Sequence, residues 1–380
     1  MRKTINIGDL GTIITGKTPP TTNKNYYGDY AVFIKPTDIS EHSKYTYETE
    51  EMYSKLAAEK YESSLIPKGA ICVPCIGTIG TKMTMAPCDC YTNQSINSII
   101  CNENYDNEYV YYLIKKFLPG LKAYNLGTAS GREYVSKSNF EKIELVAEQD
   151  KEIQKKIGVI LSRYDSLIEN YQKQIKLLEE AAQRLFKEWF VDLRFPGHEN
   201  TNIIDGVPEG WEKKKVGDIT PIITGKKDAN FGTPDGEYPF FTCSQEPIKA
   251  PSFSFDSAAV LLAGNGDFNV KLYRGRFEAY QRTYVLSPYI DSHLYLLFYT
   301  ISANMTKLAA GSSGSTIKFL TKGMIDGINL NVPNDEILRS FNKKVEPIQS
   351  SRESLQSQLR LLTEARDRLL PKLMNGEIKV

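Results

Sequence analysis

The most familiar chemical spacing in the chain is Gly11-Thr12-Ile13-Ile14-Thr15-Gly16-Lys17-Thr18, which satisfies the phosphate-loop pattern of nucleoside triphosphatases. That loop holds phosphate only where a buried strand precedes it and a helix begins at the lysine. Here Pro19-Pro20 follows at once and favours extended chain. A related segment further along has Thr220 in place of the first glycine and Lys227 in place of the threonine. We therefore expect no nucleotide site here, and a triphosphatase whose activity depends on Lys17 is a minor alternative.

Cysteine and histidine spacing gives little support for metal or nucleophilic chemistry. Cys72 and Cys75 with Cys88 and Cys90 could suggest zinc, but Cys72 lies in an apolar run and the last two are too close together for the usual knuckle. The three histidines are scattered without Cys or carboxylate partners. The Asn/Asp-Pro-Pro-aromatic tetrapeptide of adenine methyltransferases does not occur. The sequence predicts reduced thiols, no metal site and no catalytic residues, so this chain is expected not to be an enzyme.

What remains is a set of basic, amide, hydroxyl and tyrosine side chains of the kinds that contact bases and phosphates. In the first half of the chain the candidates are Lys17, Tyr26, Tyr27, Lys35, Lys82, Asn93, Gln94, Arg132 and Tyr134. In the second half they are Lys226, Lys227, Lys271, Arg274, Arg276, Gln281, Arg282, Ser313, Ser315 and Lys318. Four of these cations cluster between Lys271 and Arg282, and the alternative interpretation of that cluster is an ordinary solvated hairpin.

A long helix is predicted to position these groups, from about Asp150 to Asp192. Apolar residues recur in it with the alternating spacing of a coiled-coil seam. The seam residues are Ile153, Ile157, Ile160, Tyr164, Leu167, Tyr171, Leu178, Ala181 and Leu185. Charged and amide residues fill the other faces, so the helix can stand in water as a spacer.

A second copy of the pattern lies near the C-terminus, at a constant shift of 184 positions between 176–185 and 360–369. Its predicted pairing residues are Leu355, Leu359, Leu362 and Leu369. The two helices are therefore expected to pack against each other. Proline disrupts helix interiors, so we expect a break or kink near Pro347 and a shorter continuous helix after it, closed by Pro371 and by Asn375-Gly376.

The globular parts are also repeated. Segment 7–17 has a near copy at 216–226, a shift of 209. Short β-branched or aromatic runs separated by Gly, Pro, Asn and Asp predict β-rich domains of the α+β class, with strands at 31–34, 70–73, 96–101, 258–262 and 283–286. Each domain is expected to close through a Gly/Ser-rich loop, at 127–131 and 311–315. The predicted organisation is a first domain at 1–149, a helix at 150–193, a linker at 194–215, a second domain at 216–334, and a second helix with a tail at 335–380.

Composition excludes some classes of protein. No apolar run approaches the roughly 18 residues of a membrane span, and no signal-peptide core follows Met1, which points to the cytoplasm. The formal net charge of +1 leaves little general attraction for nucleic acid. DNA binding would therefore depend on local patches or on partners.

The tandem layout with paired helices resembles the specificity subunit of type I restriction-modification systems. The most specific features are Gly206-Val207-Pro208-Glu209-Gly210-Trp211 before Val216-Gly217-Asp218, then Ile76-Gly77-Thr78-Ile79-Gly80, and the helix end at 177–186. The Gly/Ser loop before Phe319-Leu320 also resembles the close of a target recognition domain. The first domain departs from the pattern because it lacks the Pro-Glu-Gly-Trp lead-in.

The resemblance implies two target recognition domains in tandem, separated by two long helices in an antiparallel coiled coil. Each domain would read one half of a bipartite DNA site, and the helices would set the gap. It further implies two modification subunits that methylate adenine N6, and restriction subunits that translocate and cleave DNA. This chain would bind no cofactor, whereas the assembled complex would use S-adenosylmethionine, ATP and Mg²⁺. The alternative from another class is a coiled-coil scaffold with protein-binding domains.

Overall fold

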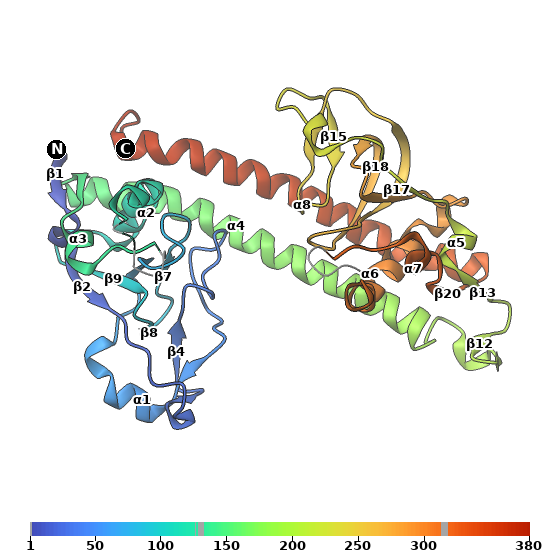
Figure 1. Cartoon of the computed structure of the whole chain (residues 1–380), viewed down its shortest axis with the longest axis horizontal. Coiled ribbons are helices and arrows are strands. Elements are labelled where there is room, and N and C mark those ends of the chain that lie inside the picture. The colour runs from blue at the N-terminus through green and yellow to red at the C-terminus, as the bar shows by residue number, and fades with distance from the viewer. Residues whose placement is uncertain (1, 126, 128–132, 313–317) are drawn as a thin grey trace. The chain divides into compact units, whose positions relative to one another are not determined.

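The computed structural model describes residues 2–125, 127, 133–312 and 318–380, and these form two compact units. Unit 1 comprises Met1–Lys173 and Leu355–Val380, and unit 2 comprises Gln174–Ser354 (Figure 1). Two long helices, α4 (Lys151–Phe186) and α8 (Asp335–Asn375), contribute a part to each unit. Each unit therefore contains a β-rich portion and a portion of both helices, which confirms the predicted α+β class.

Unit 1 is built on two small sheets. Its strands are β1 (Arg2–Asn6), β2 (Gly11–Thr15), β3 (Tyr27–Gly28), β4 (Ala31–Ile34), β5 (Met52–Tyr53), β6 (Ile71–Pro74), β7 (Thr84–Met85), β8 (Tyr91–Thr92), β9 (Ile96–Cys101) and β10 (Glu144–Glu148). One sheet has the order β2-β9-β6-β7, the other has the order β3-β5-β4-β8, and β1 pairs with β10. The short helices are α1 (Lys55–Lys60), α2 (Asn107–Phe117) and α3 (Lys137–Glu141).

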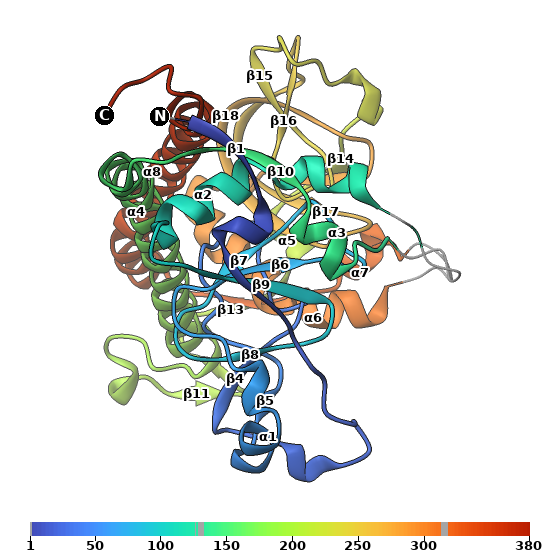
Figure 2. The same ribbon diagram turned by 90° about the vertical axis from the view of Figure 1, so that its left-hand side faces the viewer.

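The main core of unit 1 lies between α2 and the β2-β9-β6-β7 sheet (Figure 2). Asp106 caps α2, accepting a hydrogen bond from the Tyr109 N–H at 3.0 Å. Tyr109 and Tyr112 are fully buried, and Ile157 of α4 joins the same core. Gly158 permits this approach, because a Cβ there would lie 2.8 Å from Glu108 Cβ.

Unit 2 contains one larger sheet with the order β14-β19-β17-β18-β15-β16. Its strands are β11 (Ile203–Ile204), β12 (Val207–Pro208), β13 (Glu212–Lys215), β14 (Ile222–Thr224), β15 (Tyr238–Phe241), β16 (Ile248–Ala250), β17 (Phe255–Ala263), β18 (Val270–Ala279), β19 (Thr283–Leu286) and β20 (Asn329–Val332). β13 pairs with β20, as β1 pairs with β10 in unit 1. The helices are α5 (Val216–Ile219), α6 (Leu294–Gly311) and α7 (Lys322–Asp326).

The stretch predicted as a linker contributes to the core of unit 2. Phe195 and Trp211 are buried, with ring centroids 4.7 Å apart. Trp189 and Phe190, in a π-helical turn at Lys187–Val191 after α4, pack against Phe341 of α8 at 5.8 and 4.7 Å. The linker prediction missed this role because the glycines and prolines between Phe195 and Trp211 indicate turns and do not show that the two aromatic rings meet.

The two long helices contact each other in both units. In unit 1 Asp165 meets Arg366, and in unit 2 Glu179 meets Arg352. Numbers rise along α4 as they fall along α8, so the helices are antiparallel, as predicted. Figures 1 and 2 show the portions of α4 and α8 in each unit lying side by side.

The buried stripe of α4 is displaced by one position along the chain from the predicted seam. Buried positions recur every seven residues at Gln154, Leu161, Ile168, Ile175 and Ala182. Ile157 is buried as predicted, but Leu167 is 46% exposed and its assignment to the seam is wrong. Ala181 is also exposed, and Ile153, Ile160, Tyr164, Tyr171, Leu178 and Leu185 are only partly buried. The physical reason is that α4 packs against its own unit as well as α8, which rotates the buried face.

The predicted break in the second helix is also wrong. Helix α8 is continuous from Asp335 to Asn375 and includes both Pro347 and Pro371, and its end agrees with the closure predicted at Asn375-Gly376. Phe341, Val345 and Gln349 on either side of Pro347 are buried, so packing holds the helix across the proline. Leu355, Leu359, Leu362 and Leu369 are partly buried.

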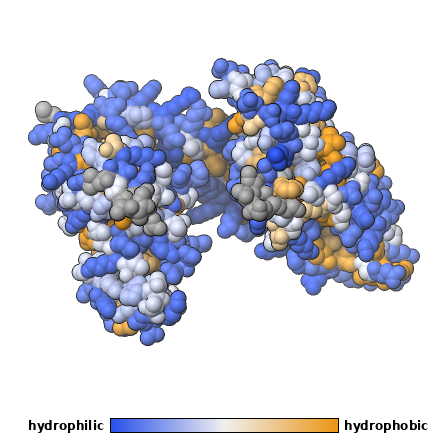
Figure 3. Space-filling view, in the orientation of Figure 1, coloured by the Kyte–Doolittle hydropathy of each residue, from blue (hydrophilic) through white to orange (hydrophobic). Residues whose placement is uncertain are grey.

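Hydrophilic residues cover most of the face shown in Figure 3. Within the described ranges no helix combines the length and the apolar character needed to cross a membrane.

Candidate nucleic-acid interface

In unit 1, four separate segments meet at the ends of β2, β6 and β9. The Gly16 N–H donates to Ile96 O at 3.2 Å, and the Asn93 N–H donates to Ile34 O at 3.1 Å. The Cys75 N–H donates to Ser95 O at 2.7 Å. These bonds fix the turn 92–96 between the end of β8 and the start of β9. A further bond, from Val135 N–H to Cys75 O at 2.9 Å, ties the segment before α3 to the same place.

Unit 2 repeats this arrangement bond for bond. The Gly225 N–H donates to Thr283 O at 3.1 Å, and the Tyr280 N–H donates to Phe241 O at 3.0 Å. The Gly264 N–H donates to Arg282 O at 2.8 Å. Leu320 donates to Gly264 O at 2.8 Å, as Val135 does to Cys75. The isolated bridges Ile76–Tyr134 and Asn265–Phe319 also correspond. We call this arrangement the repeated edge, made of turn 92–96 with 16–18, 75–77 and 134–137 in unit 1, and turn 279–283 with 225–228, 264–266 and 319–322 in unit 2.

The repeated edge aligns residues that the sequence alone leaves unpaired. Gln94 corresponds to Gln281, Ser95 to Arg282, and Tyr134 to Phe319. Ser136 and Thr321 also correspond, since each caps the helix that follows by accepting from a backbone N–H. The two units therefore share a scaffold on which several exposed side chains differ.

In unit 2 the repeated edge is hollowed. A cavity of about 370 Å³ is lined by Thr224, Gln281, Arg282, Tyr284, Phe319 and Lys322, among others. Gln281 and Arg282 are exposed. In the part of the chain that the structure describes, no ion pair or hydrogen bond engages the Arg282 guanidinium or the Lys322 ammonium group. The site thus combines a glutamine amide with cations that pair with no carboxylate of the described residues.

In unit 1 the repeated edge carries fewer unpaired cations than it does in unit 2. Gln94 is exposed, and its Oε1 accepts a hydrogen bond from the Thr18 hydroxyl. Lys17 Nζ donates to Ser63 Oγ at 3.3 Å, and the Thr15 hydroxyl donates to Asn97 Oδ1 at 2.7 Å. The counterpart of Lys322 is Lys137, which pairs with Glu141 at 3.6 Å. Unit 1 therefore presents mainly amide and hydroxyl groups here.

The predicted cluster between Lys271 and Arg282 is not one patch. Lys271 is partly buried, which lowers its pKa, and its Nζ donates to Ser244 O at 2.8 Å. Arg274 lies over the Tyr295 ring and 3.4 Å from Glu346, whereas Arg276 lies 3.1 Å from Asp256. Only Gln281 and Arg282 reach the repeated edge. The grouping fails because Lys271, Arg274 and Arg276 lie on strand β18, where each finds a different partner.

Other second-half candidates lie close to the repeated edge. Lys226 follows Gly225 and is exposed, and Lys318 precedes Phe319 and is exposed. Lys227 Nζ lies 4.3 Å from the Phe231 ring centroid, and its backbone O accepts from the Gln281 N–H at 2.9 Å. Ser313 and Ser315 lie outside the described residues, as does Arg132 in the first half.

The remaining first-half candidates fall into separate places. Tyr26 accepts a hydrogen bond from Lys60 Nζ at 2.6 Å, and Tyr27 donates to Pro19 O at 2.8 Å. Burial lowers the pKa of Lys35, but hydrogen bonds to Glu50 and Glu51 outweigh it, so the net shift is upward. Lys82 is partly buried in the loop after Gly77. Asn93 Oδ1 accepts from the Ser95 N–H at 3.1 Å and shapes the turn that carries Gln94.

The phosphate-loop pattern has no matching structure. Residues 11–15 form strand β2, and no helix begins at Lys17-Thr18. Cys72 and Cys90 pack in one buried apolar cluster. Burial raises the pKa of Cys72 and of Cys75 to about 12, which keeps both thiols protonated. Within the described ranges no three His, Cys, Asp or Glu side chains are grouped so as to hold a metal ion.

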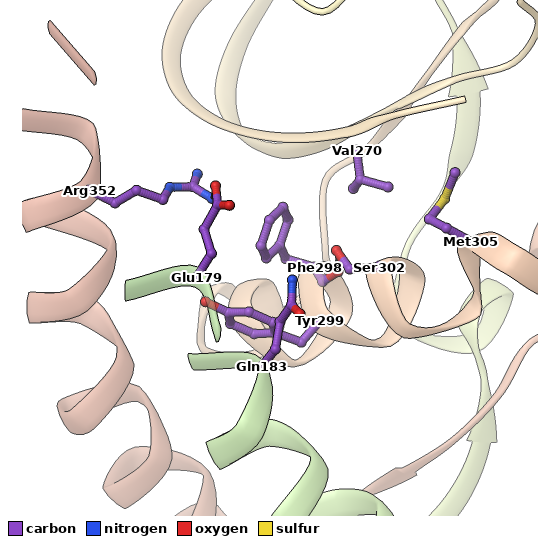
Figure 4. Close-up of a pocket in the computed structure, with 8 residues that line it drawn as sticks. All are labelled: Glu179, Gln183, Val270, Phe298, Tyr299, Ser302, Met305 and Arg352. Atoms are coloured by element: carbon purple, nitrogen blue, oxygen red, sulfur yellow. Dashed lines mark hydrogen bonds and ion pairs between the residues drawn. The ribbon is translucent and has the colours of Figure 1, made fainter. Parts of the chain in front are cut away.

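A second hollow in unit 2, of about 190 Å³, lies beside the helix pair rather than at the repeated edge. Figure 4 shows Arg352 of α8 and Glu179 of α4 meeting at its side, with Phe298, Tyr299 and Ser302 of α6 below. Arg352 Nη1 lies 3.4 Å from Glu179 Oε1. Because the polar groups face each other, this hollow serves the packing of α4, α6 and α8.

Sequence reasoning missed Thr18, Ser95, Asp228, Phe319 and Lys322 as members of the repeated edge. The signal was present but incomplete. Shifts of 209 and 184 residues mark the two ends of the repeat, whereas Gln94 and Gln281 are separated by 187. Insertions between the segments therefore conceal the correspondence until the backbone hydrogen bonds are known.

Comparison with known proteins gives a consistent result. The family model for the type I restriction modification DNA specificity domain matches residues 2–180 and 208–351. The chain is 27% identical over 406 aligned positions to the type I restriction enzyme MjaIX specificity subunit of Methanocaldococcus jannaschii, covering 98% of this chain and 93% of that one. It is 36% identical to the EcoDI specificity subunit of Escherichia coli over 45% of this chain and 39% of that one.

Among solved structures, the type I restriction-modification S subunit from M. genitalium has a TM-score of 0.67. The match covers 98% of this chain and 96% of that one, at 16% identity. This likeness shows a shared fold.

Proposed function

Because the chain belongs to the type I restriction modification DNA specificity family, we propose that it is the DNA-reading, non-catalytic subunit of such a system. Each unit reads one half of a bipartite, asymmetric DNA site. The observation that carries this proposal is the repeated edge, one scaffold present twice with different exposed side chains. Two such surfaces in one chain suit a target with two unlike halves.

The side chains at the repeated edge suit major-groove readout. Glutamine bonds adenine at N6 and N7, and arginine bonds guanine at O6 and N7. Arg282 and Lys322 in unit 2 are available for bases or phosphates because no carboxylate of the described chain neutralises them. The net charge of +1 limits the general attraction to DNA, so stable binding depends on partner subunits as well.

The paired helices are proposed to set the gap between the half-sites and to dock the modification subunits. Helix α4 has 36 residues and would extend about 54 Å at 1.5 Å per residue. Most of its exposed positions carry charged or amide side chains, although Val159, Leu167 and Leu177 are exposed as well. Helices that continue from one unit into the other would set one gap length, whereas a flexible linker would tolerate many.

Catalysis in the proposed assembly resides in other chains. Two modification subunits would use S-adenosylmethionine to methylate an adenine in each half-site, after rotating it out of the duplex. Restriction subunits would use ATP and Mg²⁺ to move and cleave DNA. This chain's contribution is to select the site and hold the partners on it.

Co-expression with the cognate modification subunit tests the proposal. Methylated adenines on a plasmid are mapped by sequencing, with and without this chain. The expected result is methylation at one motif with two short specified halves and a fixed unspecified gap. Methylation that does not require this chain, or that occurs at a single undivided motif, would refute the proposal.

A further inference from the structure

We propose that Gln94 and Gln281 are the equivalent base-reading residues of the two units, that each recognises an adenine in its half-site, and that Thr18 and Asp228 are their positioning residues. This inference rests on the proposed function and deepens it. It assigns one specificity-determining side chain to the same place in each half of the chain.

Both glutamines stand on turns that the sheet holds rigidly. In unit 1 the Ile96 N–H donates to Asn93 O at 3.1 Å and closes the turn across Gln94. In unit 2 the Thr283 N–H donates to Tyr280 O at 2.8 Å and closes the turn across Gln281. The carbonyl of the residue after each glutamine accepts a backbone hydrogen bond: Ser95 O from the Cys75 N–H, and Arg282 O from the Gly264 N–H. A side chain on such a turn is fixed at its base and exposed at its tip, as base reading requires.

Each amide is also held by a residue from the segment after the equivalent glycine. Thr18, two residues after Gly16, donates its hydroxyl to Gln94 Oε1. Asp228, three residues after Gly225, accepts from Gln281 Nε2 at 2.6 Å. The two partners thus fix the amide from opposite ends, one at its oxygen and the other at its nitrogen.

Both amides keep the groups that adenine needs. An amide oxygen has two lone pairs and an amide nitrogen has two N–H donors. Gln94 retains one lone pair and both donors, and Gln281 retains its oxygen and one donor. Each can therefore accept from adenine N6 and donate to N7 at the same time.

The residues beside the glutamines explain how one scaffold reads two different half-sites. Gln94 lies between Asn93 and Ser95, whereas Gln281 lies between Tyr280 and Arg282. The bulk and charge next to the shared amide therefore differ. We expect the adenine to be common to both half-sites and its neighbours to differ.

The test uses the full chain with its modification subunit and a plasmid library randomised at both half-sites. Gln94→Ala is expected to relax one position of one half-site, so that preference for adenine there falls about 10-fold or more. Gln281→Ala is expected to do the same in the other half-site only. Gln94→Glu is expected to shift the preferred base from adenine to cytosine, because a carboxylate accepts from cytosine N4 and repels adenine N7.

Thr18→Val and Asp228→Asn test the positioning roles. Each is expected to broaden the base preference at the same position as its glutamine, by less than the alanine variant does. A purely structural role would lower methylation of all sequences equally and leave the base profile unchanged. Gln356→Ala, on an exposed position of α8, is the matched control and should leave both half-sites as they are.

An unchanged base profile in Gln94→Ala and Gln281→Ala would overturn the inference, as would a uniform loss of methylation without any change of preference. Neither result would affect the proposed function, provided that the unaltered chain still directs methylation to a bipartite motif. Loss of that motif in the unaltered chain would instead refute the function itself.

Discussion

Asp165 and Arg366 form the most buried ion pair between the two helices. Their Oδ1 and Nη1 atoms lie 2.6 Å apart, and the Tyr112 hydroxyl donates to Asp165 Oδ2 at 2.6 Å. Both charged residues are less than 9% exposed. Asp165→Ala is expected to lower the free energy of unfolding by up to about 3–5 kcal/mol, because it removes the buried carboxylate and leaves Arg366 only the more exposed Asp367, at 2.8 Å, as a partner. Urea denaturation followed by circular dichroism measures this.

The exposed pair Arg368–Glu364 on the same helix is the control, with side chains 77% and 49% exposed. Glu364→Ala should cost less than about 1 kcal/mol. Replacing both members of the buried pair, as Asp165→Leu with Arg366→Met, should cost less than Asp165→Ala alone. Equal effects of Asp165→Ala and Glu364→Ala would contradict the assignment.

His293 gives unit 2 a pH-dependent stability. Burial lowers its pKa, with nearby Lys214 adding to the effect and Asp335 opposing it. The folded state therefore favours the neutral ring, while the unfolded chain binds a proton near pH 6.5. The contribution of His293 to the free energy of unfolding is therefore fully present above pH 6.5. It is lost as the pH falls from 6.5 towards the lower pKa of the folded state.

His293→Gln should therefore flatten the fall in unfolding free energy between pH 7.5 and pH 5.5. Both tryptophans, Trp189 and Trp211, lie in unit 2, so their fluorescence follows the unit that contains His293. A variant with the same slope as the original chain would show that His293 does not contribute to it.

At the level of single residues, the sequence names candidate side chains but does not show how the fold groups them. Gln281 and Arg282 were both candidates, and the structure brings them to Lys322, forty positions further on, through the bond from Leu320 to Gly264. No local pattern encodes that contact. Conversely, Arg274 and Arg276 are close in sequence, yet Glu346 and Asp256 hold them at different places.

Among the elements, helix α8 carries Pro347 in its interior. The proline has no N–H to donate to the Lys343 carbonyl, and its ring crowds the preceding turn. Pro347 is exposed, so its side chain adds little packing. Pro347→Ala is expected to raise the free energy of unfolding of unit 2 by about 1–3 kcal/mol. Tryptophan fluorescence during urea denaturation reports the change.

Ser350→Ala is the control, because it is exposed one turn further along the same helix. It removes no proline and should stabilise by about 0.5 kcal/mol at most. A destabilised Pro347→Ala variant would show that the proline shapes the helix in a way that the packing of unit 2 requires.

The elements themselves were largely predictable. The strands expected at 31–34, 96–101 and 283–286 agree with β4, β9 and β19 residue for residue. The phase of the α4 seam was not predictable, because apolar residues occupy both candidate stripes. Leu167 and Ile168 are neighbours of equal hydrophobicity, and only contact with the rest of unit 1 buries the second.

For the whole molecule, the tandem plan was visible in the two shifts of the repeat. The sequence could not show that each compact unit takes part of both helices, because helices distant in the chain are assigned to units only by their contacts. This division matters for design. The boundary falls at Lys173/Gln174 in α4 and at Ser354/Leu355 in α8, so an insertion there lies between the residues of the two units.

Seven residues inserted at both boundaries should lengthen the unread gap of the DNA target. A heptad keeps the spacing of the buried stripe and adds about 10 Å to each helix. At 3.4 Å per base-pair step, this corresponds to about three base pairs. Mapping of methylated adenines should show both half-sites unchanged and a longer gap between them.

The matched control inserts the heptad into α4 alone. Asp165–Arg366 and Glu179–Arg352 then no longer fit one register, so one of the two contacts must break. We expect this variant to lose stability and methylation, while the doubly extended chain keeps both. A double insertion that leaves the gap unchanged would mean that the helices do not measure the site, and altered bases within a half-site would mean that they help to read it.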